Sequence, residues 1–396
     1  MRLPLSLSFG EDFSLEPGNP PRVAGLLLFC VSLFAVFLLA ACASRPETGY
    51  LTPVNLAGSQ PTAHHVLVAT TRARDSRPGT YFNGERAGAL DFAQFTVDVP
   101  QQHVSGNIEW PSNAPGNPKK NFVVSDASYL DGDKEFIKNL NSQLALRPRG
   151  SRNVLLFVHG YNTMFAEGLY RLTQIVHDSR VPGVPVLFTW ASRGKVGQYV
   201  YDTNSATIAR DDLVHTIRLI LASDADKVNI VAHSMGNWVT VEALRQIKIS
   251  GKALAINRIG LVVLAAPDID IDVFKSQMRS FGKPKKPFYI VISKDDKALR
   301  TSSFIAGGPA RLGAEADTDE LAALGAVVVD MTNVKANDSS HHGKFAELAE
   351  LGPELGTVLA GGIGGTSEPE NGGALQTIVT APIVLLGGTV QITRAP

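Results

Sequence analysis

The chain has 396 residues, of which 44% are hydrophobic and 19% are charged, with 37 basic and 37 acidic side chains. An apolar fraction near one half excludes a wholly disordered chain. A formal net charge of zero provides no basic field for a nucleic-acid partner, and 7% aromatic residues disfavour a stacking surface for single strands. We therefore expect a globular protein that binds no nucleic acid.

Residues 1–41 are predicted to be a secretory leader. Their apolar core, GLLLFCVSLFAVFLLAA, follows Arg22 and ends in small residues, as in a signal peptide. The expected cleavage point lies between Ala41 and Cys42. The four residues Leu-Ala-Ala-Cys42 around it resemble a bacterial lipobox. Cys42 is therefore the expected site of lipidation, with residues 42–62 as a polar tether. The alternative is a plain signal peptide or an uncleaved membrane anchor.

From residue 151 onward, short continuous apolar runs alternate with helical patterns. Such runs suit strands buried on both faces of a parallel sheet, and helices between them predict βαβ units. We expect one α/β domain over residues 63–350, with a mostly parallel, doubly wound sheet and helices on both faces. The expected strands are His65–Thr70, Ala93–Val99, Val154–Val158, Val186–Trp190, Val228–Ala232, Ile259–Ala265, Phe288–Ile292 and Ala326–Met331. The expected helices are Ala166–His177, Ser205–Leu221 and Asn237–Ile247.

Residues 351–396 form a Gly-rich C-terminal tail with an apolar end. Two interpretations are open: the tail docks a last strand on the domain, or it associates with a membrane. Pro382 and neighbouring glycines interrupt any spanning segment, which favours the first.

The pattern of a nucleophile elbow surrounds Ser234. The strand Val228–Ala232 runs into a tight turn and then a helix, with the serine at its apex, which is the context that this motif requires. Ala232 and Gly236, two positions away on each side, are small enough for the crowded turn. Ser234 is therefore the predicted nucleophile.

A serine hydroxyl needs a base to take its proton and an acid to orient that base. In this fold the acid and then the histidine follow the serine in the chain. Asp295 and Asp296 follow one expected strand, while His341 and His342, the last two of nine histidines, follow the next. Both pairs thus lie at strand C-terminal ends, where open α/β sheets place their sites. The residues alone leave both members of each pair as candidates.

Two backbone N–H groups are predicted to form the oxyanion hole. One belongs to Met235, directly after the nucleophile. The other belongs to Tyr161, in the turn that follows Val154–Val158. Trp190 and Tyr199 are expected to line the pocket, although packing in the core is an equal alternative for Trp190.

Several motifs together resemble a known family. They are FVHGYNT, TWASRG, YDTNSA, VAHSMGNW, AAPDID, SKDDKAL and HHGKFAE, preceded by ATTRAR. Over residues 65–350 the chain is similar to the DUF900-type group of bacterial α/β-hydrolases, which are predicted esterases or lipases. The resemblance implies a Gram-negative source, and hence an outer-membrane lipoprotein that faces the periplasm.

The same resemblance distinguishes the paired candidates. The family's nucleophile matches Ser234, and its S-x-N-D-x-A-L stretch places the acid on Asp296, with Asp295 as the alternate. Its H-S-Y-F-A stretch places the base on His342, with His341 as the alternate. Lys344 replaces a family aromatic residue, which we expect to alter the rim of the pocket.

No cofactor or metal is predicted. The sequence lacks HExxH, paired CxxC, EF-hand and phosphate-loop patterns. Asp268, Asp270 and Asp272 suit a loop or helix start better than a cation site.

These features predict a membrane-tethered serine hydrolase that cleaves carboxylic esters, lipid-derived ones among them, through an acyl-enzyme intermediate. A non-catalytic envelope lipoprotein that uses the fold for binding is the competing hypothesis. An amidase or thioesterase with the same triad is a further one.

Overall fold

The computed structural model describes residues 45, 47–250, 257–315, 317–336, 338–345, 379–385 and 388–394. The expected leader and the expected lipidation site Cys42 lie outside the described residues. Within the described part of the chain, no helix combines the length and the apolar character that a membrane span requires.

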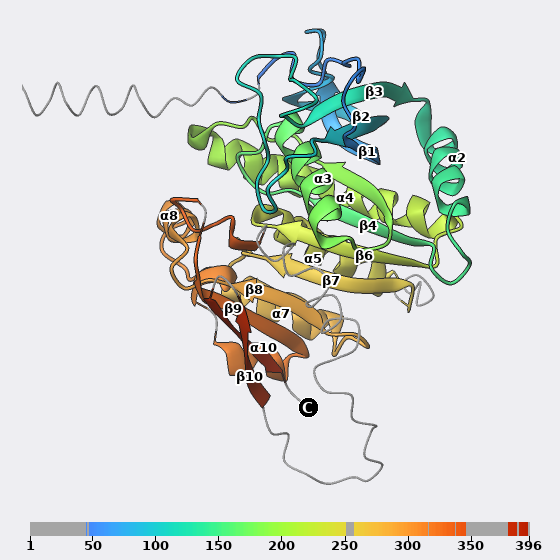
Figure 1. The fold of residues 1–396 in the computed structure, drawn as a ribbon. Helices are drawn as coiled ribbons and strands as arrows, with labels where there is room; N and C mark the ends of the chain where they lie inside the picture. The colour runs from blue at the N-terminus through green and yellow to red at the C-terminus, as the bar shows by residue number, and fades with distance from the viewer. Residues whose placement is uncertain are drawn as a thin grey trace, which may run out of the picture. The chain divides into compact units, whose positions relative to one another are not determined.

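A single sheet organises residues 62–394 (Figure 1). Its strand order is β10-β11-β9-β8-β7-β6-β4-β5-β1-β2-β3. The strands from β9 to β1 in this order run parallel, while β2 and β3 at one edge and β11 and β10 at the other are antiparallel. Their bounds are β1 Thr62–Arg74, β2 Phe82–Val99, β3 Val123–Leu130, β4 Asn153–Val158, β5 Val184–Thr189, β6 Lys227–His233, β7 Ile259–Ala265, β8 Phe288–Ile292, β9 Ala326–Val334, β10 Val379–Leu385 and β11 Gly388–Arg394.

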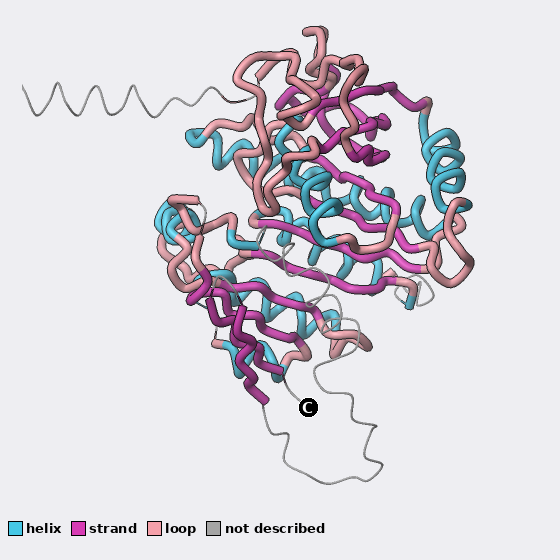
Figure 2. Tube along the Cα trace, viewed as in Figure 1, coloured by secondary structure: helices cyan, strands magenta, loops and turns pink. Residues whose placement is uncertain are grey.

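Helices fill the connections and cover both faces of the sheet (Figure 2). One face packs against α2, α4, α5 and α7, and the other packs against α3. The helices are α2 Gly132–Ala145, α3 Phe165–Ser179, α4 Tyr199–Ala222, α5 Met235–Ile249, α7 Ile271–Phe281, α8 Lys297–Ile305, α9 Leu312–Glu315 and α10 Thr318–Ala323, with a short 3-10 turn η1 at Val196–Gln198. This arrangement confirms the predicted α/β-hydrolase fold class.

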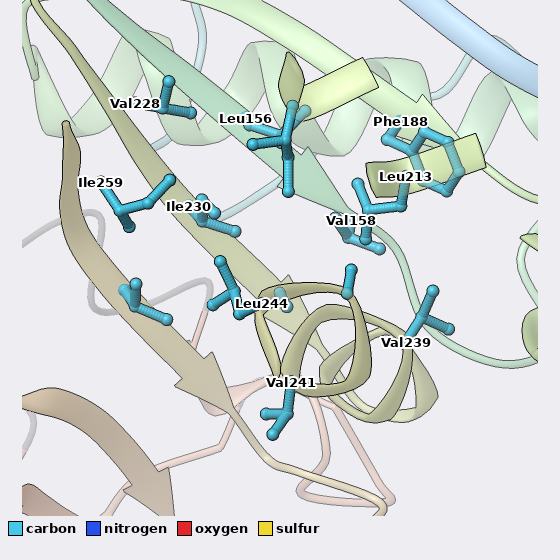
Figure 3. Close-up of a cluster of buried hydrophobic side chains, with 14 of the residues drawn as sticks. Leu156, Val158, Phe188, Leu213, Val228, Ile230, Val239, Val241, Leu244 and Ile259 are labelled. Atoms are coloured by element: carbon cyan, nitrogen blue, oxygen red, sulfur yellow. The ribbon is translucent and has the colours of Figure 1, made fainter. Parts of the chain in front are cut away.

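The core beneath the site is built from β-branched and leucine side chains. Leu156 of β4 and Ile230 of β6 are fully buried, as are Val239 and Leu244 of α5 to within 1%. Figure 3 shows these side chains gathered between the central strands and α5. Because α5 begins directly after Ser234, this packing fixes the start of the helix relative to the end of β6.

The N-terminal boundary differs from the expected tether over residues 42–62. Leu51 is 1% exposed, its N–H bonds to the carbonyl of Gly79, and the N–H of Val54 bonds to Val124. The segment around Leu51 therefore packs on the domain. Its composition is mostly polar, so the sequence did not indicate that Leu51 is buried in the core.

The C-terminal boundary also lies further along the chain than residue 350. Strand β11 pairs antiparallel with β9, and β10 pairs with β11. Of the two interpretations of the tail, the structure has the docked strand, so the sheet continues through residues 379–394. The Gly-rich stretch before β10 lies outside the described residues.

Several helices of the alternating region (α7 to α10) and two elements before it were not predicted from the sequence. Strand β3 and helix α2 precede the alternating region. The burial of β3 alternates only weakly along its length, and α2 buries a narrow stripe of Phe136, Leu140 and Leu144 beneath a strongly polar surface. Neither pattern gives a continuous apolar run.

Candidate active site

Ser234 lies at the turn between β6 and α5 in a left-handed conformation, with φ of 53° and ψ of −124°. A non-glycine residue in this region stores backbone strain. The turn is crowded, since a Cβ on Gly236 would lie 2.4 Å from the carbonyl oxygen of His159. A Cβ on Gly160 would lie 2.6 Å from Cβ of Ser234. Both glycines are therefore required for this backbone path.

Asn237, three residues into the helix region, holds the turn in place. Its side-chain amide donates to the carbonyls of Ser234, at 2.9 Å, and Ala265, at 2.8 Å. The Ser234 N–H also donates to Ala265, and the Asp268 N–H donates to the Ser234 carbonyl at 3.2 Å. The ends of β6 and β7 are thus tied together beneath the serine.

Asp296 and His342 form a buried pair. Asp296 follows β8 and is fully buried, and its Oδ2 accepts a 2.7 Å hydrogen bond from Nδ1 of His342, whose side chain is 18% exposed. Burial disfavours the imidazolium, but the hydrogen bond and the charge of Asp296 outweigh it, so the pKa of His342 is raised above 6.5. With Nδ1 bound to the carboxylate, Nε2 is the nitrogen left for proton transfer.

The alternate candidates Asp295 and His341 form a second pair directly beside the first. His341 Nδ1 lies 2.7 Å from Asp295 Oδ2, but the two side chains are 32% and 35% exposed. Asp295 also accepts bonds from the Lys344 ammonium at 2.8 and 2.9 Å. Burial would raise the pKa of Asp295, yet these hydrogen bonds lower it to about 2.

Lys344 does not extend to a pocket rim. It is 3% exposed, and besides Asp295 its Nζ donates to the carbonyls of Met331 and Thr332. Lys344 thus anchors the histidine loop to the end of β9.

His233 connects the serine turn to the histidine loop. Its Nε2 donates to the carbonyl of His342 at 3.3 Å, and the two rings lie 4.6 Å apart. The other face of the His233 ring stacks on Phe345. No hydrogen bond between Ser234 Oγ and His342 is formed in the described part of the chain, and such contacts commonly tighten only when substrate binds.

The predicted oxyanion donors come from two different elements. Met235 is the first residue of α5, and the first N–H groups of a helix have no intrahelical partner. Tyr161 lies in the loop after β4, where its hydroxyl binds the carbonyl of Val196. The next residue, Asn162, has a left-handed φ of 56° and donates its N–H to Asp202.

Arg72 of β1, a fully buried arginine, holds the Tyr161 loop against its neighbour. Its guanidinium donates to the carbonyls of Thr163, Ser192 and Asn83, at 2.7, 2.8 and 3.2 Å, and to the hydroxyl of Thr189 at 2.7 Å. Desolvation by burial lowers the pKa of Arg72 to about 10, which leaves the group charged at neutral pH.

Asp202 of α4 holds the same two loops through their N–H groups. It is fully buried and accepts bonds from the backbone of Asn162 and Arg193 and from the hydroxyl of Ser192. Arg72 binds carbonyls and Asp202 binds N–H groups, so the two charges together fix the loops over residues 159–163 and 190–194.

Trp190 supports the loop from below. Its ring is fully buried and stacks on His159, and its Nε1 donates to the His159 carbonyl at 3.0 Å. Burial and the charge of Arg72 lower the pKa of His159 to about 3, so this histidine is neutral. Of the two alternatives for Trp190, the geometry favours core packing.

Tyr199 lies closer to the predicted site. Its ring packs edge-on against Tyr161, with centroids 5.1 Å apart, and its hydroxyl donates to Asp268 at 3.1 Å. Burial and the charge of Asp268 raise the pKa of Tyr199 to about 12.

The comparison with protein families matches residues 133–359 to the model described as "Alpha/beta hydrolase of unknown function (DUF900)". The match spans more than half of the chain and covers the serine turn, both aspartates and both histidines. The chain belongs to the DUF900 family of α/β hydrolases.

More distant similarities accompany this assignment. Solved structures of two mutant forms of the esterase rPPE are similar at 14% and 13% identity, with TM-scores of 0.31 and 0.32. These comparisons cover 87% and 88% of this chain and 99% of each esterase chain. No curated protein matches.

A cavity of about 660 Å³ in this α/β hydrolase lies on the far side of the Arg72 loops. Among the residues that line it are Arg72, Asp75, Phe82, Met164 and Ser192. Neither the serine turn nor the histidine loop contributes to its wall, so its volume is not that of the predicted catalytic pocket.

One group of potential metal ligands occurs among the described residues of this DUF900 protein: His103, His177 and Asp178, with ligand atoms within 4.8 Å of one another. Both nitrogens of His103 are already bound, Nδ1 to Glu109 and Nε2 to Asp178, each at 2.8 Å. Because His103 spans two carboxylates, the cluster has the geometry of an ion-pair network.

The sequence interpretation missed Arg72, Asp202 and Asn237. Arg72 and Asp202 lie within the ATTRAR and YDTNSA stretches that carried the family resemblance. The available signal was a charged residue inside an otherwise apolar or helical pattern. If such a residue is buried, its charge is normally paired with another group, which makes it a candidate for a structural or functional role.

Proposed function

We propose that this α/β hydrolase is a serine hydrolase that cleaves carboxylic esters through an acyl-enzyme intermediate. One observation carries the proposal: the strained turn at Ser234 lies beside the loop that bears a buried Asp296–His342 pair. A carboxylate that is fully buried and bonded to a histidine favours one tautomer and stabilises the imidazolium that forms during proton transfer.

The chemistry follows from these roles. Ser234 Oγ attacks the ester carbonyl carbon while its proton passes to Nε2 of His342, and Asp296 stabilises the positive ring. The N–H groups of Met235 and Tyr161 bind the oxyanion. The C–O bond to the alcohol then breaks, His342 returns the proton to the leaving oxygen, and an acyl-serine remains. Water repeats the sequence, releasing the acid and restoring Ser234.

Activity on p-nitrophenyl esters from acetate to palmitate, compared with Ser234→Ala, tests this proposal. We expect hydrolysis that disappears in the variant, with the chain-length optimum distinguishing an esterase from a lipase. Covalent labelling by a fluorophosphonate, followed by peptide mapping, tests the nucleophile independently of substrate.

Each outcome distinguishes the hypotheses. Labelling at Ser234 without ester hydrolysis favours an amidase or thioesterase. A folded protein that neither labels nor hydrolyses any ester supports the non-catalytic binding protein.

We also propose that a lipid on Cys42 tethers the enzyme to the cell envelope, at the outer membrane facing the periplasm. The lipobox-like sequence before Cys42 supports this. Expression of the full chain in a Gram-negative host with radiolabelled palmitate tests it: the label is expected on the protein and lost in Cys42→Ser, and membrane fractionation gives the location. Retention of label in the variant contradicts the lipoprotein assignment.

A further inference from the structure

Arg311, just before α9, is a buried arginine whose guanidinium forms no hydrogen bond with a described residue. Its side chain is 9% exposed, and its one ion pair joins Nε to Asp268 Oδ1 at 3.3 Å. It donates no hydrogen bond to any residue in the described part of the chain, and its Nε is sealed from solvent without such a partner. The two terminal nitrogens also have no hydrogen-bond partner among the described residues, and they are not sealed from solvent.

Arg72 provides the comparison within the same molecule. It is 1% exposed, and its guanidinium binds three carbonyls, a hydroxyl and an imidazole. Buried guanidinium groups in a folded protein normally reach this degree of satisfaction, since an unsatisfied buried donor is destabilising. Arg311 departs from this rule. It pairs with Asp268, whose N–H donates to the carbonyl of the predicted nucleophile Ser234.

The groups around Arg311 bind one another rather than its terminal nitrogens. Asp268 accepts bonds from the hydroxyl of Tyr199 and from the hydroxyl of Ser302, besides its ion pair with Arg311. The unfilled donors of this cluster are therefore the N–H groups of the Arg311 guanidinium. A group that completes it must bring acceptor atoms.

Contacts link this cluster to the predicted catalytic residues. The Asp268 N–H donates to the carbonyl of Ser234 at 3.2 Å, and the Asp268 charge acts on the pKa of His342 through space. Tyr199, bonded to the same carboxylate, packs against Tyr161. The cluster thus lies between the serine turn and the predicted oxyanion loop.

We propose that the terminal nitrogens of Arg311 bind an anionic group of the substrate, a carboxylate or a phosphate, close to the ester that Ser234 attacks. A planar guanidinium matches two oxygens of either anion with parallel hydrogen bonds. Asp268 orients the guanidinium through its Nε edge and leaves the outer edge for the substrate. The inference rests on the proposed esterase function and narrows its substrates to esters that carry a negative charge.

Matched ester pairs test the inference on the full chain. Monomethyl adipate and methyl hexanoate share a six-carbon acyl group and differ in the terminal carboxylate. On the alcohol side, 4-acetoxybenzoate is compared with its neutral methyl ester, and 4-acetoxyphenyl phosphate supplies the phosphate. We expect kcat/KM at least tenfold higher for the anionic member of at least one pair, through a lower KM. The preferred member identifies the anion and its side.

Arg311→Met should abolish that preference while neutral esters keep their rate within about threefold, and Arg311→Lys should retain part of it. Arg300→Met, at an exposed position of α8, is the matched control and should leave the preference for anionic esters unchanged. The wild-type comparison keeps the test valid if Arg311→Met fails to fold.

Two results overturn the inference. If neutral esters are hydrolysed in a Ser234-dependent manner but no anionic ester is preferred by the wild type, the Arg311 assignment fails and the esterase proposal stands. If no ester is hydrolysed and Ser234 is not labelled by a fluorophosphonate, both fail together.

Discussion

His342 Nδ1 donates a 2.7 Å hydrogen bond to Asp296 Oδ2, and that carboxylate is fully buried. The adjacent pair, His341 and Asp295, has the same separation, but both side chains are about one-third exposed. Burial therefore distinguishes two pairs that the hydrogen-bond distance does not. Asp296 loses its hydration on burial, and the hydrogen bond with His342 compensates for that loss. The exposed Asp295 can bind water as well as His341.

Substitutions in the Asp296–His342 pair should lower kcat, whereas substitutions in the adjacent Asp295–His341 pair should leave it nearly unchanged. We expect His342→Ala and Asp296→Asn to lower kcat by about 10³–10⁴-fold, since the serine loses its base or the base its orientation. His341→Ala is the matched control and should retain kcat within about threefold. Asp295→Asn should also retain activity, although Lys344 loses its partner and the Tm falls. Steady-state kinetics on a p-nitrophenyl ester decide between the pairs, and an equal loss in His341→Ala contradicts the assignment.

The pH dependence of kcat/KM should report the raised pKa of His342. Catalysis requires the neutral imidazole, so activity falls as the pH drops through that pKa and the acid limb should lie above pH 6.5. Replacing Asp296 by Asn removes the charge that stabilises the imidazolium, so the limb should move to lower pH as kcat falls. A limb that does not move in Asp296→Asn would show that another group titrates.

Arg72 and Asp202 should affect the rate more than substrate binding. Arg72→Met leaves the carbonyls of Thr163 and Ser192 unbonded, which we expect to lower the stability by about 1–3 kcal/mol. The loosened Tyr161 loop should lower kcat at least tenfold with a smaller change in KM, because oxyanion donors act mainly in the transition state. Kinetics and thermal melts of Arg72→Met and Asp202→Asn measure this.

The control for Arg72 is Arg74→Met on the same strand. Arg74 is 53% exposed and pairs with Asp91, so its loss should change the stability by less than about 1 kcal/mol and leave kcat intact. Equal effects at both arginines, or normal kcat in Arg72→Met at a temperature where it is folded, contradict the loop-holding role.

His103 should make the stability depend on pH. Burial lowers its pKa, but its hydrogen bonds to Asp178 and Glu109 outweigh this, so the folded pKa lies above the unfolded value near 6.5. The ion pair therefore contributes fully below pH 6.5, and its contribution is lost as the pH rises through the folded pKa. Denaturation midpoints of wild type and His103→Gln should differ most below pH 6.5 and converge at alkaline pH. His215→Gln, which removes an exposed ion pair with Asp133, is the matched control and should change the midpoint little.

The fold was predictable because its buried strands are nearly continuous apolar runs, as in Val154–Val158 and Phe288–Ile292. Strand β3 lacked that signal because only three of its eight residues are buried. Chain order and strand ends led to the Asp295–Asp296 and His341–His342 neighbourhoods. Within each pair, the family resemblance favoured one member, but the physical difference between the members is burial, a long-range property that local sequence does not carry.

The environments of Arg72 and Arg311 also could not be predicted from the local sequence. In the sequence each is one of 37 basic residues. Arg72 becomes a structural centre because two loops and strand β2 bring carbonyl groups to it. Arg311 is a candidate binding group because no segment brings a carbonyl to its guanidinium. Neither environment exists until segments far apart in the chain have met.

The pairing of β11 with β9 affects how this enzyme matures. The loop that carries His342 leaves the end of β9, yet the strand that covers the outer edge of β9 consists of residues 388–394, which follow that loop in the chain. An emerging chain thus holds a complete serine turn long before this edge is closed, and an open edge invites pairing with other chains. Strand β11 thus protects the edge of the sheet from which the His342 loop leaves.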